Sequence, residues 1–245
     1  MAPMAPVQLE FDPSVDGDKG SYVREMFTTI APRYDLLNRV LSFNIDRSWR
    51  RRAVSRLGWQ SAPTGTYLDL CAGTLDLAAA LARQPAFRGT VIGADFVVPM
   101  LRLGRAKAER MKAVGADALA LPFDDARFYG CTVGFGVRNL TDLDRGMEEI
   151  ARVLKVGARL VVLEFSTPQR WPIKPLYQCY SRHVLPRVGR WVSKHATAYS
   201  YLPDSVLGFP GPSQFADRFR RAGFRDVDYQ PLTFGIATIH WGIRT

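Results

Sequence analysis

The apolar and polar positions between residues 66 and 165 alternate between two patterns. Compact apolar runs, typical of buried strands, occupy residues 66–70, 90–94, 113–116, 131–135 and 159–165. Apolar residues at helical spacing fill the intervals, over residues 77–83, about 98–112 and 142–154. Strands that alternate with helices favour a parallel sheet with right-handed crossovers. The sequence therefore predicts an α/β fold, a mostly parallel sheet with helices on both faces.

The chain on either side of this core is predicted to be organised differently. Helical spacing before the core is interrupted at Pro32, and the C-terminal part reads as a helix and two strands over residues 227–232 and 236–241. A long proline-rich insertion precedes that helix, and such insertions are usually lids or substrate-shaping elements. The predicted organisation is a flexible tail (1–20) before a single domain (21–245), with a helical cap (21–60), an α/β core (66–165), an insertion (166–212), and a C-terminal helix and strand pair (213–245).

Short polar side chains mark the predicted helix starts. Ser21, Asp46 and Ser213 each precede a run of helically spaced apolar residues, where their oxygens can accept hydrogen bonds from unpaired backbone N–H groups. Gly223 is predicted to end the last helix.

Composition and charge narrow the function classes. The 245 residues carry a formal net charge of +10, without a run of about 18 apolar residues that could span a membrane and without a secretory signal. Cys71, Cys131 and Cys179 have neither disulfide nor zinc spacing, which favours a reducing cytoplasm, and we expect no metal site. The positive charge serves solubility or attracts the chain to an anionic surface. Because no nucleic-acid-binding motif accompanies it, we rank a membrane surface first and expect no nucleic-acid partner.

Residues 67–76, Tyr-Leu-Asp-Leu-Cys-Ala-Gly-Thr-Leu-Asp, carry the strongest chemical signal. They run from a predicted strand through a small-residue loop into a helix, at the sheet edge where such folds bind ligands. A pyrophosphate-binding loop offers free N–H groups, whereas Asp69 and Asp76 here would repel a phosphate. They suit an ammonium and a sulfonium, so the loop favours S-adenosylmethionine, with Gly73 and Thr74 beside it. The structural alternatives are that Asp69 only ends a strand and that Asp76 only caps a helix.

Acids also end the next two predicted strands. Asp95 lies about 20 residues after the glycine loop, where a carboxylate can bind both hydroxyls of an adenosine ribose, although a dinucleotide enzyme uses the same arrangement. The loop lacks G-x-G-x-x-G, which disfavours NAD. Asp117, followed by Ala118, stands where a carboxylate can meet an adenine amino group, or it is only a surface acid. Phe96 and Gly134 belong to the same predicted edge.

The fourth predicted strand is followed by Arg138 and Asn139. An arginine beside a sulfonium is electrostatically unfavourable unless an anion is also present, and an oxyanion on a phenolic substrate would supply one. The alternative is a structural ion pair with Asp142 or Asp144. We favour the functional interpretation because of the position at the strand end.

Aromatic and cationic residues interleave in the insertion. This mixture fits a lipid headgroup boundary, and it fits a solvated helix pair equally well. His183, in the same segment, is either a packed histidine or a proton acceptor.

Together these motifs resemble the ubiquinone/menaquinone-biosynthesis C-methyltransferase family, a branch of the class I S-adenosylmethionine-dependent methyltransferases. The resemblance runs from about Val23 to the C-terminus. Its most specific motifs are Phe135-Gly136-Val137-Arg138-Asn139, Leu163-Glu164-Phe165-Ser166 with Pro168, and Tyr180-Ser181-Arg182-His183-Val184-Leu185-Pro186. Further matches are Ile30-Ala31-Pro32-Arg33-Tyr34-Asp35, Ser42-Phe43, Trp49-Arg50, Leu68-Asp69-Leu70, Gly73-Thr74, Asp76-Leu77 and Leu121-Pro122-Phe123.

The resemblance implies a Rossmann-like, seven-stranded sheet with an antiparallel closing strand, an N-terminal helical extension, and S-adenosylmethionine as cofactor. The substrate it implies is a polyprenylated hydroquinone methylated on a ring carbon, as in the step from demethylmenaquinol to menaquinol or a benzoquinol step to ubiquinone. The enzyme is then expected in the cytoplasm, peripheral to the inner face of an anionic membrane, and a homodimer stays open. The candidate residues are Tyr34, Arg138 and Asn139 for catalysis; Asp69, Ala72, Gly73, Thr74, Asp95, Phe96, Asp117, Ala118 and Gly134 for the cofactor; and His183, Tyr199 and Tyr201 for the substrate.

The chain departs from the family at the loop, which reads Ala72-Gly73-Thr74-Leu75-Asp76 where the family usually has Gly-Gly-Thr-Gly-Asp. If position 75 has a positive φ, leucine there costs about 1 kcal/mol. Its side chain could also crowd the methionine tail. Three alternatives stay open: methylation of another lipophilic phenol, a cyclisation that uses the bound sulfonium, and a non-catalytic role in a quinone-synthesis assembly.

Overall fold

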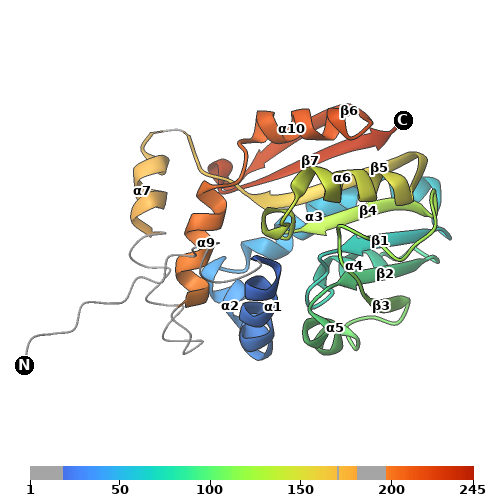
Figure 1. The fold of residues 1–245 in the computed structure, drawn as a ribbon, viewed down its shortest axis with the longest axis horizontal. Coiled ribbons are helices and arrows are strands. Elements are labelled where there is room, and N and C mark those ends of the chain that lie inside the picture. Colours follow the sequence, from blue (N-terminus) through green and yellow to red (C-terminus); the bar gives the residue numbers. More distant parts are fainter. Residues whose placement is uncertain (1–18, 170, 181–196) are drawn as a thin grey trace, which may run out of the picture.

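Seven strands form one sheet in this computed structural model, which describes residues 19–169, 171–180 and 197–245 (Figure 1). The strands are β1 (Thr66–Leu70), β2 (Thr90–Asp95), β3 (Met111–Gly115), β4 (Phe128–Gly134), β5 (Leu154–Phe165), β6 (Phe224–Leu232) and β7 (Ala237–Arg244). Their order is β3-β2-β1-β4-β5-β7-β6. Strands β1 to β5 are parallel, and β7 pairs antiparallel with both β5 and β6. The predicted mostly parallel sheet with an antiparallel closing strand is confirmed.

Helices cover both faces of the sheet. They are α1 (Lys19–Ile30), η1 (Ala31–Arg33), α2 (Tyr34–Leu41), α3 (Ile45–Arg56), η2 (Trp59–Ser61), α4 (Asp76–Ala82), α5 (Val98–Gly104), η3 (Val137–Asn139), α6 (Leu143–Val153), α7 (Ile173–Cys179), α9 (Thr197–Leu207), α10 (Pro212–Arg221) and η5 (Thr233–Gly235). On β5, Leu160 and Val162 join the core formed with α6 and α10, while Val161 and Leu163 join the core formed with α3 and α4. This division follows from the two-residue repeat of a strand.

Helices α1, α2 and α3 precede the sheet, and Pro32 lies in η1 between the first two, as the interrupted pattern predicts. Met26, Ile30 and Leu37 of this region pack against Tyr201 and other side chains of the insertion. The insertion therefore contributes to the wall of the molecule next to the N-terminal helices, beside the carboxyl ends of the parallel strands (Figure 1). None of the helices in the described part of the chain is both long and apolar enough to cross a membrane.

The predicted helix over residues 98–112 is wrong in its second half, because α5 ends at Gly104 and β3 already begins at Met111. A Cβ at Gly104 would lie 2.2 Å from the carbonyl oxygen of Thr74, so the chain here touches the neighbouring loop. Residues Met111 to Gly115 pair with Val91 to Asp95 of β2. The ladder with β2 therefore determines the conformation of residues that the helical spacing assigned to a helix.

The predicted helix caps are also wrong. Ser21 lies inside α1, Asp46 is the second residue of α3 after the N-cap Asn44, and α10 begins at Pro212, ahead of Ser213. The Asp46 carboxylate does not cap α3, because it accepts the Ser42 hydroxyl and pairs with Arg50. The predicted end of α10 is confirmed by Gly223, whose φ is +86°.

Candidate active site

The loop between β1 and α4 has an unusual backbone. Cys71, Gly73 and Leu75 take φ values of +52°, +51° and +64°. The N–H of Gly73 donates to Asp95 Oδ2 at 2.8 Å, which ties the loop to the end of β2. Position 75 thus has the left-handed conformation that favours glycine, and the leucine is strained there as the sequence predicted.

The Leu75 side chain points away from the cleft. It is fully buried, and a Cβ on Gly93 would lie 2.1 Å from its Cδ2. The glycines at positions 93 and 104 leave the space that it fills. It lines none of the cavities described below. The side chain therefore stabilises the loop from within the core and does not crowd a ligand.

The backbone donors around this loop are occupied by the protein's own carboxylates. Asp69 accepts the N–H of Ala78, in the first turn of α4, at 2.9 Å and the Thr132 hydroxyl at 2.8 Å. Asp95 accepts the N–H groups of Gly73 and Val97, both at 2.8 Å. A pyrophosphate would have to displace these carboxylates, so the geometry agrees with a cationic ligand and disfavours a dinucleotide. Burial raises the pKa of Asp69 to about 7 and also raises that of Asp95.

A cleft of about 220 Å³ collects most of the predicted cofactor residues at the carboxyl ends of β1, β2 and β4. Asp95 is almost fully buried at its wall, and Asp117 is exposed at its edge, where it accepts the N–H of Leu119 at 2.9 Å. Its lining includes Gly73, Asp95, Phe96, Asp117, Ala118, Gly134 and Asn139. Both acids keep lone pairs free, so the lining fits a ligand with hydroxyl and amino donors.

A smaller cavity adjoins the cleft and contains the other predicted cofactor residues. Asp69, Ala72, Gly73 and Thr74 line it. The Thr74 hydroxyl is not free, because it donates to Asp35 Oδ1 at 2.6 Å. Gly134 lines both spaces, but a Cβ there would lie 2.5 Å from Leu77 Cδ1. A side chain at position 134 would therefore require Leu77 to shift, so internal packing as well as a ligand favours a glycine there.

A further cavity, of about 130 Å³, has a very different lining. Apolar and aromatic side chains from the N-terminal helices, the strand ends and the insertion form most of it: Met26, Phe27, Ile30, Leu37, Trp49, Phe135, Phe165, Tyr177, Tyr180, Tyr201, Leu202, Pro203, Val206 and Ile236. Tyr34 and Phe135 line this aromatic cavity, the cleft and the small cavity. Phe135 has a φ of +59°, a strained conformation of the kind that clusters at functional sites. The two residues mark the place where the spaces meet.

Arg138 lines the aromatic cavity and is held by a buried acid. Its Nη1 pairs with Glu164 Oε1 at 2.7 Å and also donates to the carbonyl of Phe135. The side chains of Arg138 and Glu164 are only 6% and 1% exposed. The structural alternative, an ion pair of Arg138 with Asp142 or Asp144, is wrong as to the partner, because the acid is Glu164. The positive charge of Arg138 is therefore already balanced by Glu164 before any ligand binds.

The other residues predicted for catalysis and substrate binding are Asn139, Tyr34, Tyr201, His183 and Tyr199. Asn139 Oδ1 accepts the Tyr201 hydroxyl at 3.0 Å, which joins η3 to α9. Burial raises the pKa of the Tyr34 hydroxyl, and a hydrogen bond with Asn38 opposes this rise. His183 and the side chain of Tyr199 lie outside the described residues.

An ion-pair network beside the loop was not predicted from the sequence. Lys107 bridges Asp35 and Asp76 at 2.7 and 2.5 Å, and Arg50 contacts Asp76 at 3.5 Å while pairing with Asp46. The network links α2 and α3 to the cofactor loop. The one sequence signal for it is the acid and the arginine at positions 46 and 50, an i,i+4 spacing that places them on one helix face.

Solved structures share this fold. A SAM-dependent methyltransferase from Thermotoga maritima matches with a TM-score of 0.64 at 16% identity, over 90% of this chain and 99% of that one. The [4+2]-cyclase SpnF matches with a TM-score of 0.64 at 16% identity, over 92% and 96%. These likenesses concern the fold alone. With the acid-lined cleft, they define the class as a class I, Rossmann-like methyltransferase fold.

Sequence comparison narrows the class. The ubiE/COQ5 methyltransferase family profile matches residues 15–244. The chain is 45% identical over 231 residues to a ubiquinone/menaquinone biosynthesis C-methyltransferase UbiE from Geobacter sulfurreducens, covering 92% of this chain and 89% of the relative. It is 48% identical over 223 residues to a demethylmenaquinone methyltransferase from Thermus thermophilus, covering 89% and 100%. The chain therefore belongs to the ubiE/COQ5 methyltransferase family, as its motifs predicted.

Proposed function

We propose that this enzyme transfers a methyl group from S-adenosylmethionine to a ring carbon of a polyprenylated hydroquinone. Demethylmenaquinol is the first candidate and a benzoquinol of the ubiquinone pathway the second, in line with the names of the relatives. The observation that carries the proposal is the meeting of two unlike spaces at Tyr34 and Phe135. An acid-lined cleft suits a polar cationic cofactor, and an aromatic cavity suits an apolar ring.

Different acids along the cleft would contact different parts of the cofactor. Asp95 would accept the ribose hydroxyls, Asp117 the adenine amino group, and Asp69, with Gly73 and Thr74 nearby, would face the methionine amine. When bound, S-adenosylmethionine supplies a methyl group that its sulfonium charge already activates.

The residues of the aromatic cavity then orient the ring and remove a proton. Asp46 is the sole acid among the described residues that line this cavity, and we assign it the hydroxyl proton of the hydroquinone. Loss of that proton increases electron density at the ortho carbon. Arg138 cannot accept a proton, but it can donate a hydrogen bond to the phenolate oxygen or to a water. Tyr34 would hold the ring directly, and Asn139, which lines the cleft, would act through its hydrogen bond with Tyr201 of the cavity wall. The ring carbon that gains the methyl group then loses its hydrogen as a proton, and the oxygen regains the proton held by Asp46, so one proton in all is released per turnover.

The decisive experiment is a labelled-methyl assay with both ring types. Incubation of the enzyme with methyl-labelled S-adenosylmethionine and demethylmenaquinol should give labelled menaquinol. Label in the benzoquinol product alone would mean that the substrate is the benzoquinol of the ubiquinone pathway. Label in neither product would favour another phenol or a cyclisation.

The non-catalytic alternative makes an opposite prediction for the cofactor. A scaffold whose loop Leu75 had spoiled would show no heat on calorimetric titration with millimolar S-adenosylmethionine. We expect binding, because the Leu75 side chain faces the core and lines none of the cavities.

Replacement of Leu75 by glycine is therefore expected to change stability and not cofactor affinity. Glycine removes a strain of about 1 kcal/mol. It also deletes a fully buried side chain, which costs about 2–5 kcal/mol for a leucine truncated to alanine. Chemical denaturation should thus show a net loss of stability. The Kd for S-adenosylhomocysteine should stay within about threefold, since this side chain lines none of the cavities; a large loss of affinity at unchanged stability would place this side chain in the site.

The raised pKa of Asp69 predicts a pH-dependent affinity. Because burial raises this pKa to about 7, the carboxyl is ionised above that pH and protonated below it. A ligand ammonium is attracted to the ionised form, so the affinity for S-adenosylhomocysteine should fall as pH decreases through 7. The Asp69→Asn variant should bind more weakly and without this dependence. A similar slope in wild type and variant would assign the titration to another group.

A membrane-facing role is proposed for the outer side of α2. Leu36 and Val40 follow an i, i+4 spacing on α2 and are exposed, and Phe43, in the turn after α2, is 77% exposed. Arg39 and Arg47 are exposed nearby. Apolar side chains flanked by arginines fit the interface of an anionic bilayer, where a polyprenyl substrate resides and where the inner membrane face would recruit the enzyme from the cytoplasm.

Vesicle co-sedimentation tests this surface. Binding should increase with the anionic lipid fraction, decrease with salt, and weaken in the Phe43→Ser variant. Val156→Ser is the matched control, because Val156 is 78% exposed near the opposite end of β5 from the cavity. Equal binding by both variants, or indifference to lipid charge and salt, would remove the proposal.

A further inference from the structure

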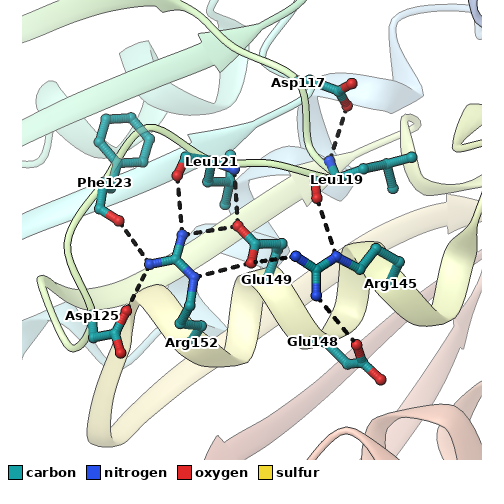
Figure 2. Close-up of polar contacts among 9 residues, drawn as sticks. All are labelled: Asp117, Leu119, Leu121, Phe123, Asp125, Arg145, Glu148, Glu149 and Arg152. Atoms are coloured by element: carbon teal, nitrogen blue, oxygen red, sulfur yellow. Dashed lines mark hydrogen bonds and ion pairs between the residues drawn. The ribbon is translucent and has the colours of Figure 1, made fainter.

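The loop from Asp117 to Phe123 is held by side chains of α6 (Figure 2). Glu149 Oε2 accepts the backbone N–H of Leu121 at 2.9 Å, and Arg152 Nη2 donates to the carbonyl of the same residue at 3.0 Å. Both backbone groups of Leu121 are therefore fixed by two charged side chains that lie one helical turn apart.

The same clamp reaches the neighbouring loop residues. Arg152 Nη1 donates to the carbonyl of Phe123 at 2.8 Å, and Arg145 Nε donates to the carbonyl of Leu119 at 3.3 Å. The carbonyls of three alternate residues, 119, 121 and 123, thus all point to arginines of one helix (Figure 2). The arginines of α6 therefore hold the backbone of this loop in addition to pairing with acids.

The acid in the clamp is buried and fully paired. Glu149 is 4% exposed and accepts Arg152 on both oxygens, at 3.0 and 2.8 Å. The Arg152 guanidinium and the Leu121 N–H hold the pKa of Glu149 below its usual range. Bidentate arginine–carboxylate pairs combine strength with a fixed geometry. Glu149 and Arg152 therefore form a rigid unit against which the loop is placed.

The loop places Asp117 at the cleft. Asp117 pairs with Ala120 in an antiparallel bridge, and its own carboxylate accepts the N–H of Leu119. Asp117, Ala118 and Leu119 all line the cleft. The residues held by α6 begin at Leu119, which itself lines the cleft directly after Asp117 and Ala118.

We propose that Glu149 and Arg152 are positioning residues for recognition of the adenine ring, acting through the loop that presents Asp117 and Ala118. This inference rests on the proposed function only in that an adenosyl group occupies the cleft. A carboxylate accepts hydrogen bonds and cannot donate them, so Asp117 selects the exocyclic amino group of adenine. The oxygen that replaces this amino group in hypoxanthine repels the carboxylate. Selection between the two bases therefore reports the position of the loop.

The test compares S-adenosylhomocysteine with S-inosylhomocysteine, in which an oxygen replaces the 6-amino group and N1 gains a hydrogen. Calorimetry on the wild-type protein should give at least about a tenfold preference for the adenosyl ligand, the factor expected for one hydrogen bond to a charged group. In Arg152→Ala and Glu149→Gln, the preference should fall to about threefold or less, because the affinity for the adenosyl ligand decreases selectively. Arg152→Lys should recover it only in part, since a lysine cannot make the bidentate contact.

A milder variant and a matched control keep the test decisive. Arg145 is half exposed, so Arg145→Ala is expected to fold and to reduce the preference less than Arg152→Ala does. Arg220→Ala removes an arginine of similar exposure that pairs with Asp217 on α10, and it should leave both Kd values unchanged. An unchanged preference in the folded clamp variants, or an equal loss of affinity for both ligands, would overturn the proposal. Absence of binding of either ligand to the wild-type protein would instead overturn the proposed function, and the inference with it.

Discussion

Replacement of Arg138 by alanine is expected to reduce turnover by about 100- to 1,000-fold, the usual effect of removing one donor that stabilises a developing oxyanion. The Kd for S-adenosylhomocysteine should change far less, because Arg138 lines the aromatic cavity and not the acid-lined cleft. Steady-state kinetics with demethylmenaquinol and calorimetry with the cofactor product measure the two effects. Equal losses in turnover and cofactor affinity would contradict the assignment.

The same substitution has a second effect that must be separated from the first. It leaves Glu164 buried without its cation, which costs about 3–5 kcal/mol of stability. The double variant Arg138→Leu with Glu164→Gln removes both charges, and the amide oxygen can still accept the Phe165 N–H that Glu164 accepts at 2.8 Å. Stability should return toward that of the wild type while turnover stays low. Recovery of activity together with stability would show that Arg138 serves the fold alone.

Arg138 also shows which part of the site could be predicted from the sequence. Its place after the fourth strand followed from the local pattern, because carboxyl ends of parallel strands share one edge. Its partner did not follow. The nearby acids are used elsewhere, since Asp142 caps α6 and Asp144 pairs with Arg218. Glu164 becomes the neighbour only because β4 and β5 pair in the register Gly134 with Leu163, a relation that no local pattern contains.

The conformation of Leu75 also has one part that the local sequence predicts and one part that depends on tertiary packing. The positive φ could be predicted because the family has glycine at that position and the loop is short. The direction of the side chain depends on Gly93 and Gly104, which come from β2 and α5 and leave room for it. The same contact of Gly104 with Thr74 accompanies the early end of α5, which helical spacing placed several residues too late. Local periodicity predicted the elements, and packing between elements determined their ends and the orientation of this side chain.

Replacement of Asp46 by asparagine is expected to reduce kcat by about 10²- to 10⁴-fold, the range for loss of a general base. Asp46 is 5% exposed in a cavity of aromatic side chains, and its Oδ1 accepts the Ser42 hydroxyl at 2.7 Å. Asparagine keeps the shape and the hydrogen bond but removes the proton acceptor. Arg50 retains Asp76 as an ionic partner, so the substitution does not leave a buried cation unpaired. Single-turnover measurements with demethylmenaquinol should show the loss in the chemical step.

Two further readouts distinguish a proton acceptor from a residue that only shapes the cavity. Asp46→Glu should recover part of the activity, since it restores the carboxylate on a longer stem, whereas Ser42→Ala should retain most of it. The KM for the hydroquinone should change little. A raised KM at unchanged kcat would mean that Asp46 binds the ring without taking its proton, and the proton would then pass to a water held by Arg138, which lines the same cavity.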